Sequence, residues 1–348
     1  MRKTAIVALT KNGAELSYRI SKELNADIYV KSAFKRPLPG VFEIAEEFSS
    51  LVGRLFTEYS ALVFIMASGI VVRTIAPYLS DKRHDPAVVV ADELGRHAIS
   101  LLSGHVGGAN QLAVRVAEAT GGIPVITTST DVNGLIAFDI FAKENDCAVE
   151  NFEILKYISS ELVNGGDLAL YSDFRLEGKL PENIEMREDR EFSSGNPGVL
   201  ISNKLYGIPE GKRILVLRPR NLIVGIGSRK GVSKEEVGKA VTDFLERNGK
   251  SLLSVKSLAT IDVKMNEKGI IDFCGEHDIP LCIVPKEAVQ EVAGGFSSSD
   301  FVMEKIGVPG VSEPCAVICG HNARLICKKT VYKGITLALA EEEKVLRI

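Results

Sequence analysis

MASGIVVRTIAPYLSDKRHDPAVVVADELGRHAISLLSGHVGGAN, the stretch from Met66 to Asn110, decides the fold of this chain. It contains two apolar runs of strand length, residues 87–91 and 98–102, and the segment 109–119 that follows has helical periodicity. A further apolar run at 61–66 leads into it, and polar or glycine-rich corners separate the segments. Buried strands joined by such corners and by helices predict a doubly wound, mainly parallel α/β sheet.

The corner SGHVGGAN, residues 103–110, lies between a predicted strand and a predicted helix. Gly104, Gly107 and Gly108 allow tight turns and the close approach of a ligand to the backbone. A glycine loop that leads into a helix places backbone N–H groups where they bind an anion. The spacing fits neither GxGxxG nor the P-loop, so a nucleotide is not the favoured ligand. The alternative is a corner that only joins strand to helix.

His105 lies inside this loop, where a side chain that exchanges protons near neutral pH would be useful for catalysis. In doubly wound sheets, ligands bind at the carboxyl ends of the strands. The residues expected at or near such ends are Ser68, Gly69, Asp92, Glu93 and the loop 103–108.

The bulk properties are those of an ordinary globular protein with two or three domains, since the chain has 348 residues, 45% of them hydrophobic and 25% charged. A net charge of -3 provides no general attraction to nucleic acid or to an anionic membrane. No apolar run reaches 18 residues, so no transmembrane helix is expected. The first residues predict a strand rather than a signal peptide, and six scattered cysteines fit reduced thiols in the cytoplasm.

The element pattern predicts three parts. Residues 1–139 form an N-terminal α/β domain with a Rossmann-like parallel sheet, in which residues 42–59 are expected to be one helix. Residues 140–218 form a small α+β middle region, to which no chemistry is assigned. Residues 219–348 form a second α/β domain.

A second glycine loop, GIGSRKG at 225–231, opens the third part. It matches GxGxxxG, which invites a dinucleotide interpretation, but no acidic residue follows at the usual offset of about 20. Arg229 and Lys230 make a site for carboxylates or phosphate at least as plausible, and a solvated basic turn is the third interpretation. Ser233 and Glu236 fit a capping box at the start of the next helix.

The cysteines near the end of the chain are candidate metal ligands. Cys315, Cys319, His321 and Cys327 do not have a standard zinc spacing, and cysteine commonly packs as a small apolar residue. No metal site is therefore expected.

Several motifs together resemble one family. Segments 69–77, 81–82, 85–88, 92–93 and 101–110 resemble the core pattern of the cobalt-precorrin-5A hydrolases, the CbiG-type enzymes of anaerobic cobalamin biosynthesis. The match continues in short segments, at 127–128, 130–131, 225–231 and 258–264. The resemblance spans most of the chain, with a divergent middle. Ser228 stands where many members carry cysteine, which argues against a thiol role there.

The resemblance implies a reaction on a cobalt-bound tetrapyrrole. The enzyme opens a δ-lactone between a ring-A acetate and the meso carbon C-20 with water, and it releases acetaldehyde to give cobalt-precorrin-5B. Cobalt arrives with the substrate, so no cofactor of the chain's own is expected. The expected partner is this small molecule, with neighbouring corrin-pathway enzymes as further candidates, and neither nucleic acid nor a membrane.

Chemical reasoning then suggests roles for the residues in the motifs. His105 is the hypothetical general base, and the N–H groups around Gly107 and Gly108 would stabilise the oxyanion. Asp92 or Glu93 would orient His105 or assist proton transfer. The remaining candidates would bind substrate, with the cations holding its carboxylates: Ser68, Gly69, Arg73, Lys82, Ser103, Gly104, Asn110, Thr128, Arg229 and Lys230.

Two other functions stay open at this stage. The chain could be a non-catalytic carrier of a corrinoid intermediate. It could also be a nucleotide-binding oxidoreductase built on the GxGxxxG loop.

Overall fold

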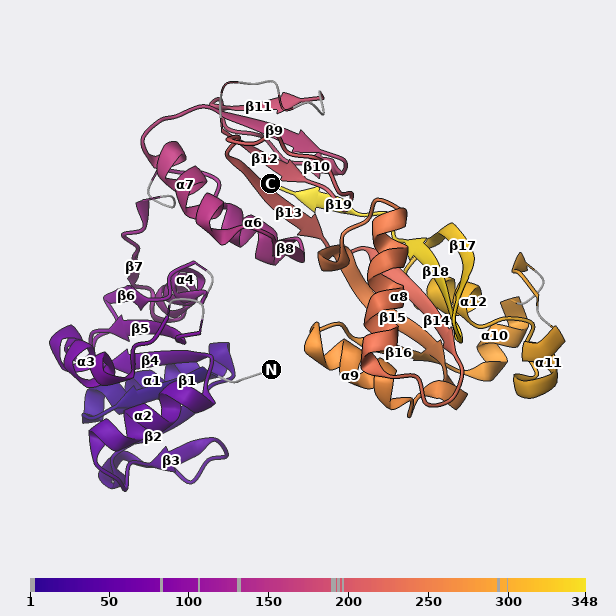
Figure 1. Cartoon of the computed structure of the whole chain (residues 1–348). Coiled ribbons are helices and arrows are strands. Elements are labelled where there is room, and N and C mark those ends of the chain that lie inside the picture. Colours follow the sequence, from indigo (N-terminus) through magenta and orange to yellow (C-terminus); the bar gives the residue numbers. More distant parts are fainter. Residues whose placement is uncertain are drawn as a thin grey trace. The chain divides into compact units, whose positions relative to one another are not determined.

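The computed structural model describes residues 4–81, 84–105, 107–129, 133–188, 192, 195, 197–292, 295–298 and 300–348. The chain divides into two compact units, Met1–Ile140 and Phe141–Ile348, and each is described by itself. Both are α/β units with sheets rich in parallel strands, which confirms the predicted fold class (Figure 1). The exact limits of the three predicted parts stay a prediction.

The N-terminal unit is built on a seven-stranded sheet of order β3-β2-β1-β4-β5-β6-β7. Its strands are β1 (Thr4–Ala8), β2 (Asp27–Val30), β3 (Val41–Glu43), β4 (Ala61–Ile65), β5 (Ala87–Ala91), β6 (His97–Leu102) and β7 (Ile123–Val125). Its helices are α1 (Lys11–Leu24), α2 (Phe48–Glu58), α3 (Ser68–Ile75), α4 (Ala109–Thr120) and the start of α6 (Phe138–Glu144), with short 3₁₀ turns at Ser32–Phe34 and Ala76–Tyr78.

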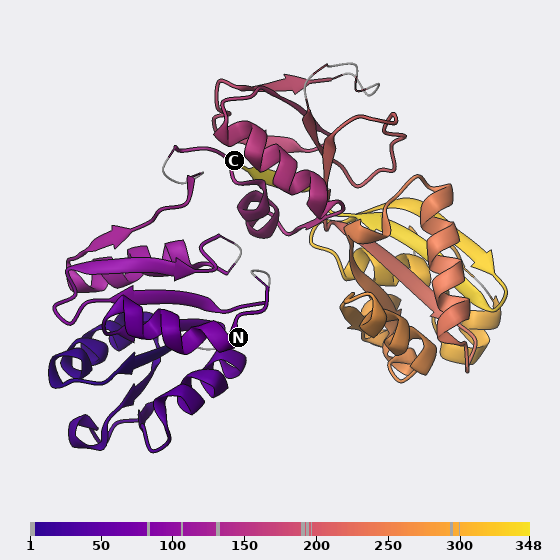
Figure 2. The same ribbon diagram turned by 60° about the vertical axis from the view of Figure 1, so that its left-hand side comes forward.

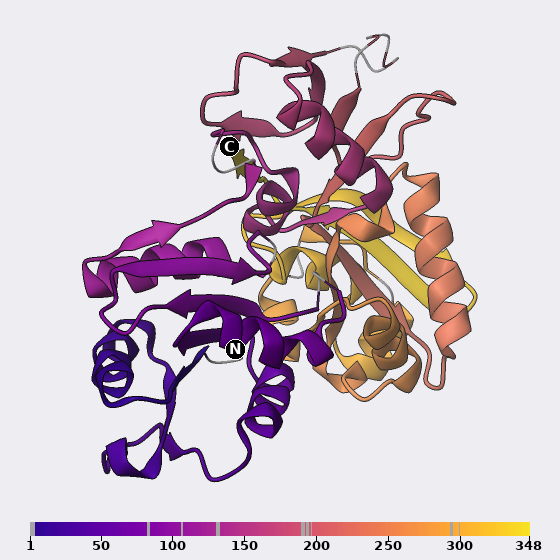
Figure 3. The ribbon, with the colours of Figure 1, turned by 90° about the vertical axis from the view of Figure 1, so that its left-hand side faces the viewer.

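Helices cover both faces of this sheet. Helices α1 and α4 contact each other and share one apolar cluster with the sheet, whereas α2 and α3 belong to the cluster on the other face (Figure 3). The strand β5 is buried at every position because it is covered on both sides. This explains why its sequence is an unbroken apolar run.

The direction of β6 differs from the parallel arrangement expected of a doubly wound sheet. Strands β1 to β5 run parallel to their neighbours, but β6 pairs antiparallel with β5, and β7 is parallel to β6. The carboxyl ends of β4 and β5 therefore lie at one edge of the sheet, and those of β6 and β7 at the opposite edge. The candidate residues follow the carboxyl ends of β4, β5 and β6, as expected, but these ends do not share one edge of the sheet, because β5 and β6 form an antiparallel hairpin.

The expected single helix over 42–59 is also wrong. Residues Val41–Glu43 form the edge strand β3, and α2 begins only at Phe48. The ring of Phe42 stacks on Tyr29 of β2, with ring centroids 5.1 Å apart. Pairing with β2 thus overrides the helical spacing of the apolar residues at the start of this segment.

The second unit begins with the sheet β11-β9-β12-β13-β8. Its strands are β8 (Cys147–Val149), β9 (Leu168–Ser172), β11 (Ile184–Arg187), β12 (Gly198–Ile201) and β13 (Ile214–Pro219), and its helix is α7 (Phe152–Val163). Only β8 runs antiparallel to its neighbour. The middle region is therefore more regular than its weak sequence signal indicated.

A second sheet in this unit has the order β16-β15-β14-β18-β17. Its strands are β14 (Leu222–Ser228), β15 (Val255–Ile261), β16 (Leu281–Val284), β17 (Arg324–Tyr332) and β18 (Ile335–Glu341). Its helices are α8 (Lys234–Arg247), α9 (Lys268–Glu276), α10 (Lys286–Val292), α11 (Asp300–Ile306) and α12 (Ser312–Ile318), with 3₁₀ turns at Leu252–Ser254 and Asp262–Lys264. Helix α8 lies along this sheet, and the predicted capping box of Ser233 and Glu236 at its start is confirmed (Figure 2).

The end of the chain links the two five-stranded sheets of the second unit and forms a small two-stranded sheet of its own. Strand β19 (Val345–Arg347) pairs with β10 (Arg175–Glu177), so the C-terminus returns to the middle region. Oε1 of Glu341 accepts hydrogen bonds from Nδ2 of Asn203, at 2.5 Å, and from Nζ of Lys250, at 3.0 Å. These buried polar contacts join β18 to the segment after β12.

Cys282 and Cys319 form a disulfide, so the expectation of reduced thiols is wrong for this pair. The β16 strand carries Cys282, and Cys319 follows α12, so the bond joins two segments 37 residues apart. Sequence spacing did not indicate it because only the fold brings these segments together. Within the described residues, no helix is long and apolar enough to cross a membrane.

Candidate active site

His105 lies beside a carboxylate that sequence reasoning missed. Nδ1 of His105 is 3.5 Å from Oδ2 of Asp139, and both side chains are largely buried, with 15% and 17% of their surface exposed. Asp139 stands in the first turn of α6, where Oδ1 accepts a hydrogen bond from the N–H of Ile140. A lone acidic residue between Phe138 and Ile140 is the only sequence signal that points to it.

The carboxyl of Asp139 is held in its charged form. Burial raises its pKa, but the hydrogen bond from His105, the charge of that ring when protonated and the N–H of Ile140 outweigh burial. The pKa of Asp139 therefore lies below its ordinary value. A buried carboxylate at Nδ1 fixes the ring orientation and stabilises the protonated imidazole, which leaves Nε2 as the nitrogen for proton transfer.

The glycine loop around His105 is folded on itself. Ser103 has a left-handed backbone with a φ of 56°, and its carbonyl accepts a hydrogen bond from Ala109. The N–H of Gly108 donates to the carbonyl of His105 at 2.9 Å. The N–H of Gly108 is therefore already used within the loop, and its predicted oxyanion role stays a prediction. In the described part of the chain, the N–H of Gly107 donates to no backbone acceptor and remains a candidate.

Four of the predicted substrate-binding residues, Ser103, Gly104, Asn110 and Thr128, take part in contacts that hold the loop. Asn110 is 5% exposed; its Oδ1 accepts from Oγ of Ser100 at 2.6 Å, and its Nδ2 donates to Oγ1 of Thr128 at 3.1 Å. A Cβ at Gly104 would lie 2.8 Å from Oδ1 of Asn110, so this glycine leaves room for the amide. Ser103 donates to the carbonyl of Asp85 at 3.1 Å. Together, these hydrogen bonds and this close packing hold the His105 loop against β6 and the segment after β7.

Asp92 and Glu93 do not orient His105. They lie in the β5–β6 turn, and the pairing of Ala91 with Ala98 and of Val88 with Leu102 puts that turn at the other end of the hairpin. The six residues of β6 span five steps of about 3.3 Å each, which separates the two ends of the hairpin by roughly 17 Å.

Asp92 has a structural role in that turn instead. Its carboxylate accepts hydrogen bonds from the N–H groups of Leu94, at 2.9 Å, and His97, at 2.7 Å. Burial raises the pKa of Asp92, but these backbone N–H groups outweigh burial and lower it. The carboxylate thus stabilises the turn and is not placed to act on His105.

Ser68 and Gly69 begin α3, at the same edge of the sheet as Asp92, and Arg73 lies in the last turn of this helix; all three are exposed. Nη1 of Arg73 donates to the carbonyl of Gly69 at 3.1 Å, so the guanidinium folds back on its own helix. The fold therefore separates these three residues from the His105 loop. Lys82 lies outside the described residues.

The predicted cations of the second glycine loop differ from each other. Arg229 pairs with Glu236 at 2.7 Å and lines a cavity of the C-terminal sheet. Lys230 is exposed and is not among the residues that line that cavity.

The glycines of this loop face other parts of the protein. A Cβ at Gly225 would collide with the carbonyl oxygen of Ser312, and a Cβ at Gly227 would lie 2.6 Å from Oγ1 of Thr336. They allow α12 and β18 to pack closely on β14, which accounts for the GxGxxxG pattern without a dinucleotide. Among the described residues, no group of three or more His, Cys, Asp or Glu side chains could hold a metal ion.

Comparison with known proteins agrees with these features. Three family models match successive parts of the chain: Cobalamin synthesis G N-terminal at 50–131, Cobalamin biosynthesis central region at 136–219, and Cobalamin synthesis G C-terminus at 222–340. They define the class as a multidomain α/β protein of cobalamin synthesis.

Curated relatives cover nearly the whole chain. A cobalt-precorrin-5A hydrolase of Priestia megaterium is 30% identical over 97% of this chain and 94% of its own length. A cobalt-precorrin-5A hydrolase of Salmonella typhimurium is 31% identical over 96% of each chain. The chain belongs to the cobalt-precorrin-5A hydrolase family, as its motifs predicted.

Among solved structures, a cobalamin biosynthesis protein G homologue from Sulfolobus solfataricus has 22% identity and a TM-score of 0.41, covering 98% of this chain and 97% of its own. CobE, a protein of the cobalamin pathway, has 26% identity and a TM-score of 0.34, covering 36% of this chain and 93% of its own.

Proposed function

We propose that this chain hydrolyses cobalt-precorrin-5A: it opens the δ-lactone with water and releases acetaldehyde, which gives cobalt-precorrin-5B in anaerobic cobalamin biosynthesis. Two relatives that match nearly the full length carry this activity in their names. The observation that carries the proposal within this chain is the largely buried His105–Asp139 pair on the glycine loop.

In the proposed reaction, Nε2 of His105 takes a proton from water as the oxygen attacks the lactone carbonyl. Asp139 holds the ring and balances its charge while the imidazole is protonated. The N–H of Gly107 is the candidate donor to the developing oxyanion. This assignment replaces the Asp92 or Glu93 partner of the original hypothesis with Asp139.

Collapse of the tetrahedral intermediate breaks the acyl C–O bond and leaves a carboxylate on ring A and an alkoxide on C-20. The alkoxide becomes the aldehyde as its carbon–carbon bond to the macrocycle breaks. The macrocycle keeps that electron pair and takes up a proton, so water and lactone are converted to acid and acetaldehyde. In this proposal the cobalt belongs to the substrate, the chain supplies no cofactor, and the reaction takes place in the cytoplasm.

The test is acetaldehyde release from enzymatically prepared cobalt-precorrin-5A, measured alongside the mass of the corrinoid product. We expect one acetaldehyde for each lactone opened, and none with heat-denatured protein. A bound corrinoid with an intact lactone and no acetaldehyde would contradict hydrolysis and support the carrier alternative. Dependence of turnover on an added nicotinamide cofactor would instead support an oxidoreductase.

A further inference from the structure

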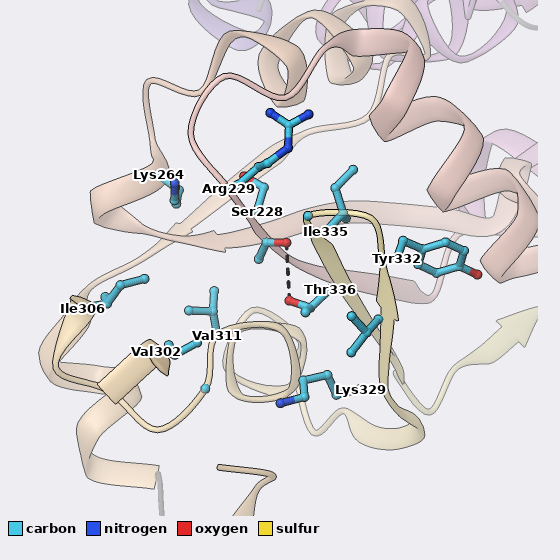
Figure 4. A pocket seen from close by; sticks show the side chains of 14 residues that line it. Ser228, Arg229, Lys264, Val302, Ile306, Val311, Lys329, Tyr332, Ile335 and Thr336 are labelled. Atoms are coloured by element: carbon cyan, nitrogen blue, oxygen red, sulfur yellow. Dashed lines mark hydrogen bonds between the residues drawn. The ribbon is translucent and has the colours of Figure 1, made fainter. Parts of the chain in front are cut away.

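The C-terminal sheet carries a cavity of about 330 Å³ that none of the hydrolysis steps above uses. It lies beside the end of β14 and the β17–β18 hairpin, and α11 contributes to its opposite wall (Figure 4). This volume is at the small end of the range for ligand pockets, about 300–1,000 Å³. By its volume, the cavity can hold either a whole small ligand or one edge of a larger molecule.

The walls of the cavity are mainly apolar. Branched side chains and exposed backbone at glycine form most of the surface: Val302, Ile306, Val311, Val331, Ile335, Gly227, Gly310 and Gly334. Oγ1 of Thr336 donates to the carbonyl of Gly227, as the dashed line in Figure 4 shows, so this hydroxyl is satisfied by the protein. An apolar body therefore fits the walls better than a strongly hydrated ion.

Three cations, Arg229, Lys264 and Lys329, line the cavity, and no acidic residue is among its lining residues. They come from separate elements, the end of β14, the 3₁₀ turn after β15, and β17 (Figure 4). Arg229 pairs with Glu236 at 2.7 Å and Lys264 with Glu267 at 3.7 Å. Lys329 makes no ion pair with the described residues, although its charge helps to lower the pKa of the nearby Glu313 carboxylate, and Lys329 lines the cavity, where a ligand can contact it.

Gly334 positions Arg229 beside the cavity. The N–H of Arg229 donates to the carbonyl of Gly334 at 2.8 Å. The Arg229 side chain also packs directly on Gly334, because a Cβ there would lie only 2.6 Å from Cδ of Arg229. Beside it, the buried Oγ of Ser228 has no hydrogen-bond partner within the described structure. A buried hydroxyl without a partner is costly, and this one stands in the wall of the cavity.

We propose that this cavity is a binding site for the carboxylate-bearing edge of a tetrapyrrole, with Lys329 and Arg229 as the principal carboxylate contacts and Ser228 as a hydrogen-bond donor. The inference rests on the proposed function for the choice of ligand. In this arrangement, an apolar edge of the tetrapyrrole packs against the branched side chains of the cavity wall, and its acetate or propionate groups contact Arg229 and Lys329.

The experiment is an equilibrium titration with dicyanocobyrinic acid, a stable corrinoid whose side chains are free carboxylates. Cobinamide, in which those carboxylates are amidated, is the comparison ligand. We expect Lys329→Gln to weaken binding of cobyrinic acid about tenfold, the size of one lost charge-assisted contact, and to leave cobinamide unchanged. Ser228→Ala should also weaken binding without lowering the melting temperature, because the hydroxyl it removes has no partner.

Lys328→Gln is the matched control, since Lys328 is the exposed neighbour on β17 and does not line the cavity. The inference is overturned if Lys329→Gln and Ser228→Ala bind cobyrinic acid as tightly as Lys328→Gln does. It is also overturned if Lys329→Gln weakens binding of ADP or inorganic phosphate but not of cobyrinic acid.

Acetaldehyde assays separate this inference from the proposed function. For an active hydrolase, Lys329→Gln should raise KM for cobalt-precorrin-5A and leave kcat unchanged. If the wild type binds cobyrinic acid through the cavity but releases no acetaldehyde, the proposed function fails and the cavity assignment stands. If the wild type is active and the cavity variants keep both Kd and KM, only the cavity assignment fails.

Discussion

The two glycine-rich segments of this chain both lead from a strand to a helix, but they differ in glycine spacing and in chemistry. The first segment, 103–108, follows β6 and precedes α4, whereas the second, 225–231, includes the end of β14 and precedes α8. In the first, the loop folds back on its own residues and brings an imidazole to a carboxylate. In the second, the glycines accommodate neighbouring parts of the protein, and the cation Arg229 borders an apolar cavity.

The difference shows that the positions of the glycines predict where the chain turns, but not which side chains or ligands lie beside the turn. A side chain at Gly225 would collide with Ser312, which is distant in the sequence. A side chain at a glycine of the first loop would instead collide with the loop's own residues or with Asn110. The chemistry comes from the side chains that other elements bring to each corner. Four experiments test this contrast, from the largest expected effect to the smallest.

The largest effect is expected for His105→Ala in the first loop. Loss of a general base should lower kcat for acetaldehyde release by roughly 10²–10⁴-fold. His97→Ala, at the exposed first position of β6, is the control and should keep its kcat. Equal activity of the two variants would remove His105 as the base.

Gly225→Ala tests the second loop through stability. The new methyl group would collide with the carbonyl of Ser312, so the free energy of unfolding should fall by roughly 3 kcal/mol in urea denaturation. Gly238→Ala in α8 is the control; its Cβ would have an ordinary contact of 3.7 Å with Phe273, and it should be neutral or stabilising. A stable Gly225→Ala protein that has lost affinity for a nucleotide would restore the dinucleotide interpretation.

Asp139→Asn tests the pair in the first loop. Misorientation of His105 should lower kcat about 10²-fold, less than loss of the imidazole itself. The folded-state pKa of Asp139 lies below its ordinary value of about 3.9, so its carboxylate stabilises the fold above that pH. This contribution should disappear as the pH falls through the folded-state pKa. Urea unfolding across that range checks the sign; a wild-type advantage that grows on acidification would contradict it.

Asp92→Ala is expected to have the smallest effect. Two backbone N–H groups lose their acceptor in a partly exposed turn, so the free energy of unfolding should fall by about 1 kcal/mol. The value of kcat should stay within the error of the wild type. A loss of activity comparable with that of Asp139→Asn would return Asp92 to the catalytic hypothesis.

Local pattern was sufficient for several features. The apolar runs at 87–91 and 98–102 are strands, the capping box at Ser233 forms, and the long motifs predicted the family correctly. These features depend on residues close together in the chain, where side-chain periodicity and capping act directly.

The tertiary structure decided the direction of β6, the partner of His105 and the cavity of the second unit. An apolar run does not encode whether its strand lies parallel or antiparallel to the next, yet that choice moved Asp92 and Glu93 to the opposite edge from His105. Asp139 is 34 residues from His105, and Lys329 is 100 residues from Arg229. Such pairs meet only when sheets and helices pack, because burial of apolar surface, not the polar residues themselves, brings distant segments together.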